Sequence, residues 1–195
     1  GAKAEARFGA PYYNFHRADL IKILADALPP DRLHLSHRLQ LFVDHGTSVE
    51  ARFSNGDEID CDVLIGADGI HSAVRRGLLG HQPPQFTGCV AYRGLVPAER
   101  VAGLGLPVEA QNWMGPGKHL VHYFVSGGRD VNVVAIIEQD TWRGESWTDP
   151  GDVADVLAAY DGWHPQVRTL IGAIDQTFKW ALFDRPPLPF WSKGR

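Results

Sequence analysis

The stretch that most constrains the fold is Cys61–Arg76, which reads CDVLIGADGIHSAVRR. Its apolar, β-branched start, Val63–Ile65, is typical of a strand buried on both faces of a parallel sheet. Gly66 and Gly69 bracket Asp68 and predict a tight turn that backbone or ligand can approach closely. A strand, a glycine-rich turn and a helix start form a corner where phosphate or a ribose hydroxyl meets N–H groups and a carboxylate. The stretch therefore indicates a nucleotide-binding corner, although the glycine pattern alone also fits a purely structural turn.

The helix after this turn has its own start signal. Ser72 can cap it through the side-chain hydroxyl, and its apolar side is formed by Ala73, Val74, Leu78 and Leu79. The order Asp-x-x-His-Ser also contains the three residue types of a hydrolytic triad. Neighbours this close rarely converge on one point, and the chain has no G-x-S-x-G elbow, so a hydrolase is disfavoured.

Composition excludes several classes of protein. The chain has 195 residues, enough for one domain or two small ones. A net charge of −4 and the lack of a basic run with interleaved aromatics argue against a nucleic-acid binder. Apolar runs are far shorter than the ~18 residues of a membrane span, and no secretory signal is present. We therefore expect a cytoplasmic protein, in which Cys61 and Cys89 are buried thiols rather than a disulfide.

The pattern of apolar residues predicts two regions. In residues 1–80 we expect a helix within Tyr12–Leu28 and strands at Arg32–Phe42, Ser48–Phe53 and Glu58–Ile65, with a turn at Asn55–Asp57. In residues 81–195 we expect strands at Thr87–Leu95, Asn112–Met114, His119–Val125, Asp130–Glu138 and Phe178–Phe183, and helices at Asp152–Tyr160 and His164–Ile174. The spacing of these strands predicts an antiparallel or mixed sheet.

The full string GADGIHSAVR resembles the Asp-Gly fingerprint of the flavin-dependent aromatic hydroxylases, which binds nucleotide downstream of their first glycine-rich loop. The resemblance implies that Asp68 serves FAD binding. HRADL resembles the family segment whose arginine reaches the flavin's pyrophosphate and ribityl region, and Arg17 matches that arginine. The backbone near Leu39 corresponds to a part that lies by the flavin's adenosine half. Without the resemblance, a solvated Arg17 at a helix start explains that residue equally simply.

The second region resembles the substrate domain of the same hydroxylases. The strings GPGKHLVHYFV, ESW at Glu145–Trp147, GWHP at Gly162–Pro165 and KWALFDRPPLPFW are most similar to the salicylate, 3-hydroxybenzoate and 6-hydroxynicotinate hydroxylase branch. The resemblance covers nearly the whole chain. It implies an α/β plus α+β architecture, with part of a FAD-binding Rossmann-like domain at 1–80 and a mixed β-sheet substrate domain with helices at 81–195.

Two motifs of the family are missing from this sequence. No G-x-G-x-x-G follows an N-terminal strand, and the Gly-Asp motif expected after Gly194-Arg195 is absent. The resemblance therefore implies that the chain is the central part of a longer enzyme. Because the first strand–loop–helix supplies most pyrophosphate contacts, we expect this part alone to bind flavin weakly or not at all.

His119 and Tyr123 are the candidate catalytic residues. Four positions apart on a strand, they share one face, with Cα atoms about 13 Å apart at about 3.3 Å per residue. A phenol titrates near ~10 and histidine near ~6.5, so a positioned imidazole can take the phenol's proton as the ring becomes a nucleophile. In the resemblance both match residues that line the substrate pocket. By spacing alone, a half-buried histidine and a packing tyrosine fit as well.

Other charged and histidine residues give weaker signals. His122 points to the opposite strand face and is expected to be structural. The pairs His34/His37 and His119/His122 are three apart, which places their rings on opposite strand faces, so no metal site is predicted. Arg93 can meet a substrate carboxylate or pair with an acidic neighbour.

The sequence and the resemblance together imply a FAD-dependent monooxygenase that hydroxylates a phenolic aromatic acid with NAD(P)H and oxygen. The expected partner is a small aromatic substrate, without nucleic acid or membrane, and a homodimer stays open. Two alternatives remain at this point. One is a flavin-dependent reductase or epoxidase on the same scaffold, which would not need His119 as a base. The other is a non-catalytic α+β binding or assembly module.

Overall fold

The computed structural model describes residues 2–140 and 149–195 and divides the chain into two compact units. Unit 1 comprises Gly1–Ala27 and Gly88–Leu182, and unit 2 comprises Leu28–Thr87 and Phe183–Arg195. The two units are built from contacts between segments that are distant in the sequence. The functional division into 1–80 and 81–195 is not tested by these contacts and stays a prediction.

Unit 1 is built on a six-stranded sheet with the strand order β5-β6-β7-β4-β9-β8. Its elements are α1 (Ala2–Phe8), α2 (Arg17–Asp26), β4 (Gln85–Pro97), η2 (Ala98–Leu104), β5 (Gln111–Gly115), β6 (Lys118–Val125), η3 (Ser126–Gly128), β7 (Asp130–Glu138), β8 (Asp149–Gly151), α4 (Val153–Ala159), α5 (Pro165–Gly172) and β9 (Thr177–Asp184). The pairs β5–β6, β6–β7, β4–β7 and β8–β9 are antiparallel. The predicted strands of this region are therefore confirmed, with β4 longer than expected.

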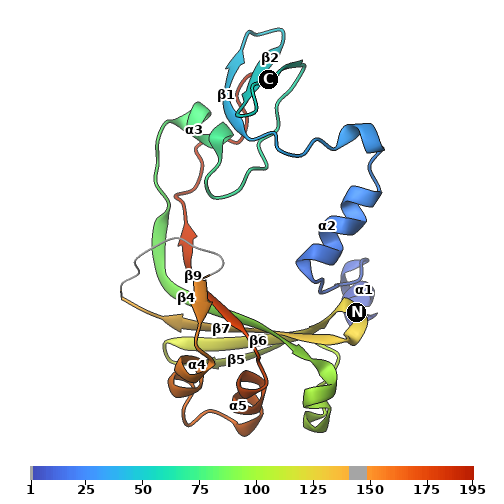
Figure 1. Cartoon of the computed structure of the whole chain (residues 1–195), viewed down its shortest axis with the longest axis vertical. Helices are drawn as coiled ribbons and strands as arrows, with labels where there is room; N and C mark the ends of the chain where they lie inside the picture. Colours follow the sequence, from blue (N-terminus) through green and yellow to red (C-terminus); the bar gives the residue numbers. More distant parts are fainter. Residues whose placement is uncertain (1, 141–148) are drawn as a thin grey trace. The chain divides into compact units, whose positions relative to one another are not determined.

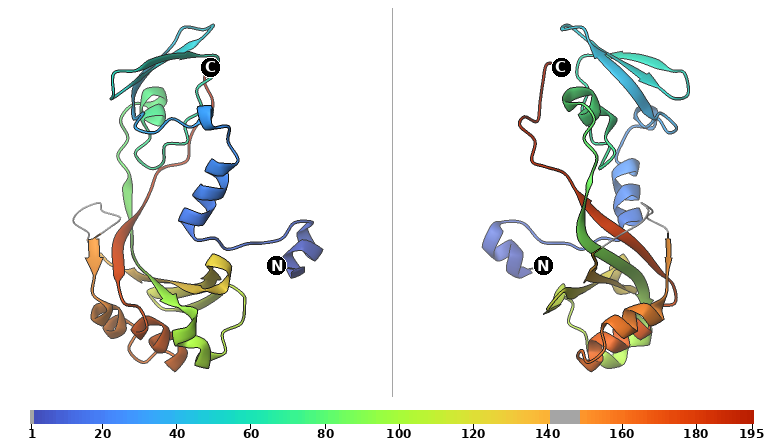
Figure 2. Two further views of the ribbon diagram at one scale, coloured as in Figure 1. Left: turned by 45° about the vertical axis from the view of Figure 1, so that its right-hand side comes forward. Right: turned by 90° about the vertical axis from the view of Figure 1, so that its left-hand side faces the viewer.

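Alternation along the strands gives the sheet two different faces. On β6, Leu120 and Phe124 belong to the hydrophobic core, while Val121 and Tyr123 point to the other side. Helices α4 and α5 lie together against one side of the sheet in both views (Figures 1 and 2). The core between them contains Val96, Leu120, Val131, Val133, Ala135, Val156, Tyr160, Val167, Leu170 and Ile171. This packing leaves the opposite face of β4, β6 and β7 available for a binding site.

Helices α4 and α5 begin within one residue of their predicted starts. The Asp152 carboxylate accepts a hydrogen bond from the Ala154 N–H at 2.8 Å at the start of α4. At the start of α5, His164 accepts from the Gln166 N–H, and Pro165 occupies the first helical position. The Tyr160 hydroxyl, directly after α4, lies 2.7 Å from the His119 carbonyl oxygen. This contact ties α4 to the backbone of β6.

Unit 2 consists of a small three-stranded sheet and one α-helix. Its elements are η1 (Pro30–Arg32), β1 (Leu39–Asp44), β2 (Val49–Phe53), β3 (Glu58–Cys61) and α3 (Ala73–Leu79). The order β1-β2-β3 is antiparallel throughout, and the predicted turn at Asn55–Asp57 joins the last two strands. Helix α3 lies beside β1 in Figure 1. Gly77 permits this approach, because a Cβ there would lie 2.5 Å from the Phe42 ring.

The parallel strand predicted at Val63–Ile65 is wrong for this structure. These residues are in no strand, and Val63 and Ile65 are 57% and 84% exposed. The Leu64 N–H does donate to the Arg195 carbonyl at 2.9 Å, but one bond does not make a ladder. A strand in the interior of a parallel sheet pairs with a neighbouring strand along each edge. Among the described residues, no strand pairs with Val63–Ile65.

Two N-terminal segments also differ from expectation in part. The predicted helix within Tyr12–Leu28 is confirmed as α2, but none of its residues is buried, and Leu24 is 59% exposed. Residues 2–8 form the helix α1, which was not predicted. Their sequence AKAEARF is rich in strong helix formers, which was the available signal.

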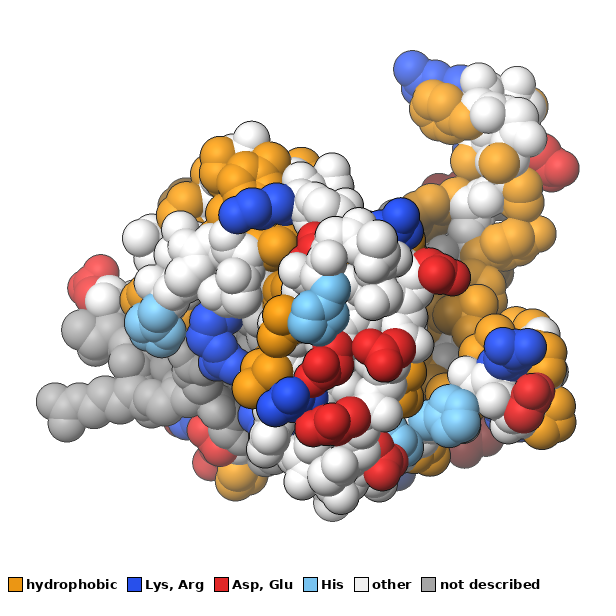
Figure 3. Space-filling model, turned by 90° about the horizontal axis from the view of Figure 1, so that it is seen from above, with side chains coloured by type: hydrophobic (Ala, Val, Ile, Leu, Met, Phe, Trp, Pro, Cys, Tyr) orange, Lys and Arg blue, Asp and Glu red, His pale blue; other side chains and the backbone are white. Residues whose placement is uncertain are grey.

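Side chains of both charge signs lie among apolar ones on the face drawn in Figure 3, as expected from a net charge of −4. Within the described ranges, no helix is long and apolar enough to cross a bilayer. Cys61 and Cys89 are free thiols, and both are partly exposed rather than buried as predicted.

The first prediction concerns Gly94, whose lack of a side chain lets Ile174 pack onto β4. A Cβ at Gly94 would collide with the Ile174 side chain. We expect Gly94→Ala to destabilise unit 1 by about 1–3 kcal/mol through overpacking. Gly103→Ala is the control, because a Cβ there meets nothing within 4 Å. Urea denaturation measures both, and equal stability of the two variants would contradict the packing.

The second prediction concerns the pH dependence of stability. His122 is 1% exposed, and burial lowers the pKa of its imidazole. The unfolded chain therefore takes up this proton first, and stability should fall as the pH drops below about 6.5. We expect a shallower fall between pH 7 and 5.5 in His122→Leu than in the unchanged chain. His81→Leu, at an exposed histidine, should keep the pH dependence of the unchanged chain. The same pH dependence in His122→Leu would refute the lowered pKa of His122.

Candidate functional site

A cavity of about 600 Å³ lies on the face of the unit 1 sheet that α4 and α5 leave open. Its floor is made by side chains from four strands: Arg93 and Leu95 on β4, Tyr123 on β6, Asn132 on β7 and Phe178 on β9. Further lining residues are Phe15, His16 and Arg17 at the start of α2, and Asp175 and Gln176 before β9. Apolar rings and a few polar groups are the usual lining of a small-molecule site.

The register of the sheet brings the floor residues together. Asn132 lies directly opposite Tyr123 on β6 and opposite Leu95 on β4. Partners in register share a face, so the three side chains point to the same side. Arg93 is two residues before Leu95 on the same face. The site is therefore a property of strand pairing rather than of one loop.

Two arginines give the cavity a positive charge. The Arg93 guanidinium stands over the Trp180 ring, 4.4 Å from its centroid, and within the described residues no carboxylate forms an ion pair with it. Burial and, to a smaller extent, the nearby charge of Arg17 lower the pKa of Arg93. The one carboxylate in the lining, Asp175, is paired with Arg100 at 2.5 Å. A bound anion would therefore relieve the repulsion between Arg17 and Arg93.

Of the two catalytic candidates, the structure places one in the cavity lining. Tyr123 lines the cavity, whereas His119 lies outside the lining, further along β6. Alternation puts both on the same face, as the spacing predicted. The backbone of His119 is fixed by the Tyr160 hydroxyl. Their catalytic roles stay a prediction.

His122 lies on the other face of β6 and is buried, which confirms its predicted structural position. Its Nε2, the Gln111 Oε1 and the Trp113 Nε1 are buried without a hydrogen-bond partner among the residues that the structure describes. Gln111 is directly opposite His122. These atoms belong to the packed face of the sheet and not to the cavity.

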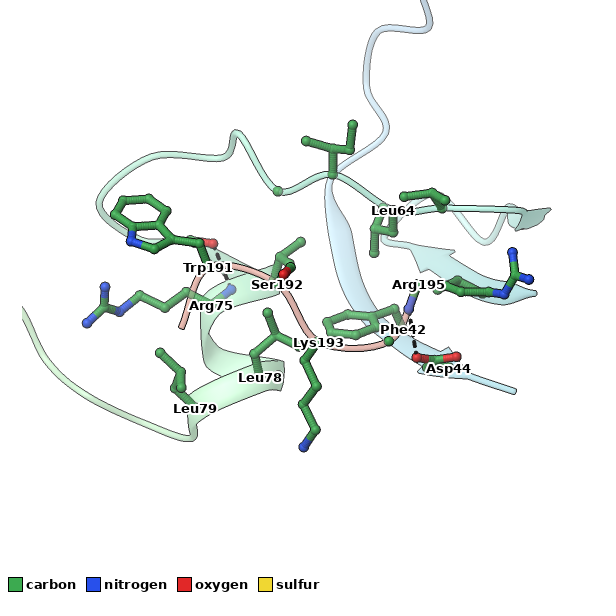
Figure 4. Close-up of a pocket in the computed structure, with 18 of the residues that line it drawn as sticks. Phe42, Asp44, Leu64, Arg75, Leu78, Leu79, Trp191, Ser192, Lys193 and Arg195 are labelled. Atoms are coloured by element: carbon green, nitrogen blue, oxygen red, sulfur yellow. Dashed lines mark hydrogen bonds between the residues drawn. The ribbon is translucent and has the colours of Figure 1, made fainter. Parts of the chain in front are cut away.

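A second hollow, of about 800 Å³, lies within unit 2 beside the Asp-Gly turn. Figure 4 shows Trp191–Arg195 running past α3, with Phe42 on β1 nearby. Asp68, Gly66 and Gly69 are part of its lining. Gly66 needs to be glycine, because a Cβ would lie 2.6 Å from the Val74 side chain. Gly69 has a φ of +78°, which an L side chain rarely adopts.

Asp68 holds the turn onto the start of α3. Its carboxylate accepts hydrogen bonds from the Ser72 hydroxyl at 2.5 Å, the Ala73 N–H at 2.6 Å and the Val74 N–H at 3.3 Å. Burial by itself would raise the pKa of Asp68, but these hydrogen bonds outweigh it and lower the pKa. Ser72 caps the helix as predicted, accepting from the Arg75 N–H at 2.9 Å. Because most of its lone pairs are used, Asp68 acts mainly by shaping the turn.

Arg185 also holds this turn, although no sequence pattern predicted this role. Its Nε donates to the Ile70 carbonyl at 2.7 Å, and the other guanidinium nitrogens donate to the Ile70 and Gln82 carbonyls. The two residues are 115 positions apart, so no local sequence pattern could have predicted this contact.

The remaining predicted site residues are distributed over both units. Arg17 lines the unit 1 cavity, and Leu39 is the first residue of β1 in unit 2, outside the lining of the unit 2 hollow. The Glu145–Trp147 motif lies outside the described residues. Within the described part of the chain, no group of three His, Cys, Asp or Glu side chains could hold a metal.

Comparison with known proteins identifies relatives of this chain by sequence and by structure. The chain is 38% identical, over 100% of its length and 49% of the relative's, to a 3-amino-4-hydroxybenzoate 2-monooxygenase of Streptomyces platensis. A solved salicylate hydroxylase–substrate complex matches with a TM-score of 0.76 and 30% identity over 92% of this chain and 48% of that one. The chain is homologous to FAD-dependent aromatic hydroxylases. No protein-family profile matches it.

A second solved structure agrees with the first. HpxO of Klebsiella pneumoniae, solved with FAD and uric acid, matches with a TM-score of 0.79 and 27% identity over 96% of this chain and 48% of that one. The resemblance to these hydroxylases and the mixed α/β architecture are thereby confirmed. The chain spans about half the length of the relatives it matches.

The third prediction tests the role of Asp68 in the turn. Asp68→Ala removes the acceptor for two backbone N–H groups and a hydroxyl, so it should cost about 0.5–2 kcal/mol, as loss of a helix cap does. Because folding lowers the pKa of Asp68, its contribution is present above about pH 4 and is lost as the pH falls through the folded pKa. Thermal unfolding at pH 7 and pH 3 measures this difference.

Asp60→Ala, at an exposed carboxylate on β3, is the matched control. An Asp68 variant as stable as this control at pH 7 would mean that the carboxylate does not hold the turn.

Proposed function

We propose that this chain is the substrate-holding part of a FAD-dependent monooxygenase that hydroxylates a phenolic aromatic acid with NAD(P)H and oxygen. The observation that carries the proposal is the unit 1 cavity, which combines aromatic walls, a tyrosine and an amide with two arginines. The homologues named above act on or bind a hydroxylated benzoate, salicylate and uric acid. All are small, planar and oxygen-rich rings.

The charge of the cavity supports an acidic substrate. Arg93 is held in place by the Trp180 ring rather than by a carboxylate, so its N–H groups can turn to a ligand anion. A guanidinium binds a carboxylate through two parallel hydrogen bonds, which also orients the ring. We assign the substrate carboxylate to Arg93 and ring contacts to Phe178 and Tyr123.

Arg17, Leu39 and Asp68 are proposed to serve the FAD cofactor. Arg17 fits this role because it is a cation at the start of α2. The acidic residue in the first turn of this helix is Asp19, and its carboxylate accepts a hydrogen bond from the Ser126 hydroxyl. Asp68 fits it indirectly, since it shapes a glycine turn that nucleotide can approach. Bound FAD would supply the activated oxygen; this chain's residues hold and prepare the ring.

The proposed role of His119 is that of a general base. A phenol gives up its proton near pH ~10, and the phenolate is a much better nucleophile than the neutral ring. An imidazole near ~6.5 is neutral at pH 7 and can accept that proton as the ring reacts. Tyr123, on the same strand face, positions the ring. A cytoplasmic location belongs to the same proposal, and a homodimer stays open.

The fourth prediction tests the function with a longer protein that carries this chain. We expect it to purify yellow and to oxidise NAD(P)H faster when a hydroxylated benzoate is added. His119→Asn should slow hydroxylation by about 10²-fold or more, the usual effect of a lost general base, with flavin content unchanged. His81→Asn, at an exposed histidine, should leave the rate unchanged.

Three results would count against this account. A colourless protein without flavin would favour a binding module. A yellow protein whose hydroxylation survives His119→Asn would remove the base and favour a reductase or epoxidase. Loss of flavin from the His119 variant would show that this residue was assigned to the wrong site.

A further inference from the structure

Asn132 is an unusual residue for its position. It lies near the start of β7, a strand at the centre of the unit 1 sheet, and is only 7% exposed. Its neighbours along β7 are apolar, from Val131 to Ile137. Asparagine is a poor strand former and is seldom buried, so a central strand gains nothing from it in stability.

The Asn132 amide has no hydrogen-bond partner within residues 2–140 and 149–195. An amide without a protein partner makes its hydrogen bonds to water or to a bound ligand. The residue lines the 600 Å³ cavity, so the amide is open to whatever the cavity contains. A polar amide that lines a cavity from an otherwise apolar strand is a group positioned for a ligand.

The position of Asn132 relative to Arg93 specifies which part of a ligand it meets. Asn132 is opposite Leu95, so Arg93 is its diagonal neighbour on β4, at a Cβ separation of about 7–8 Å. One substituted benzene ring can touch both groups at that spacing. When the carboxylate of an aromatic acid binds the Arg93 guanidinium, the Asn132 amide faces the other substituents of its ring. It can accept from a hydroxyl or amino group through its oxygen, or donate to an oxygen through its nitrogen.

We propose that Asn132 is a specificity-determining residue, which hydrogen-bonds a ring hydroxyl or amino substituent and so selects substituted aromatic acids over unsubstituted ones. The inference rests on the proposed function, because it takes the cavity to be the substrate site. Its physical basis is that a site with a built-in polar partner rejects the analogue that leaves this partner unpaired. Tyr123, opposite Asn132, holds the ring against the amide.

The test uses the FAD-loaded protein that carries this chain. Dissociation constants are measured by calorimetry for benzoate and for 2-, 3- and 4-hydroxybenzoate. In the unchanged protein, at least one hydroxybenzoate should bind about 10-fold or more tightly than benzoate. Asn132→Leu, which has a similar shape without polar atoms, should bring that isomer to the affinity of benzoate while benzoate binding stays within about 2-fold.

Two further variants complete the design. Asn112→Leu is the matched control, because Asn112 is an exposed residue of β5 outside the cavity lining, and it should keep the full discrimination. Asn132→Asp keeps an acceptor but adds a negative charge, so it should weaken all four acids by about 10-fold or more. This second variant still tests the inference if Asn132→Leu does not fold.

The outcomes separate the two proposals. If the hydroxybenzoates bind and Asn132→Leu or Asn132→Asp retains the original affinities, Asn132 is not the determinant, while the proposed function stands. If none of the four acids binds to the flavin-loaded protein, the assignment of the cavity to aromatic acids is overturned, and the role of Asn132 with it.

Discussion

The antiparallel register of β4, β7 and β6 is the constraint on which the rest of this structure depends. It pairs Leu95 with Asn132 and Asn132 with Tyr123, and so fixes three side chains on one surface. A shift of one residue in any of these pairings would move the whole set to the opposite face. The register is held by the other face of the same strands, where Val131, Val133 and Leu120 are fully buried under α4 and α5. The hydrophobic core therefore positions the candidate site without contributing a side chain to it.

The two faces of the sheet use polar groups in different ways. On the packed face, burial keeps His122 neutral, and Tyr160 uses its hydroxyl to fix the backbone of β6 at His119 and of β7 at Ile136. On the open face, Arg93 stands over the Trp180 ring without a carboxylate partner in the described ranges, and the Asn132 amide lines the cavity. A few polar groups among apolar rings in a cavity wall are the usual means of orienting a small ligand. The contrast favours a binding role for the cavity over a purely structural one.

The sequence predicted what depends on local patterns. Strand alternation placed His122 on the face opposite Tyr123, and the capping residue Ser72 located the start of α3, as the structure confirms. The sequence could not identify Asn132, because its significance comes from partners 9 and 37 positions away along the chain, read from the pairings with Tyr123 and Leu95. Arg185 was missed for the same reason. The strand predicted at Val63–Ile65 is wrong because the composition of a segment shows how apolar it is, but not whether a neighbouring strand is present to pair with it.

The most direct test is a crystal structure of the FAD-loaded protein that carries this chain, soaked with 3-hydroxybenzoate. The account predicts that the ring lies on the open face of β4, β7 and β6, with its carboxylate at Arg93 and its hydroxyl within hydrogen-bond distance of Asn132. A ring bound elsewhere, with this face covered by other parts of the protein, would contradict the claim that strand register builds the substrate site.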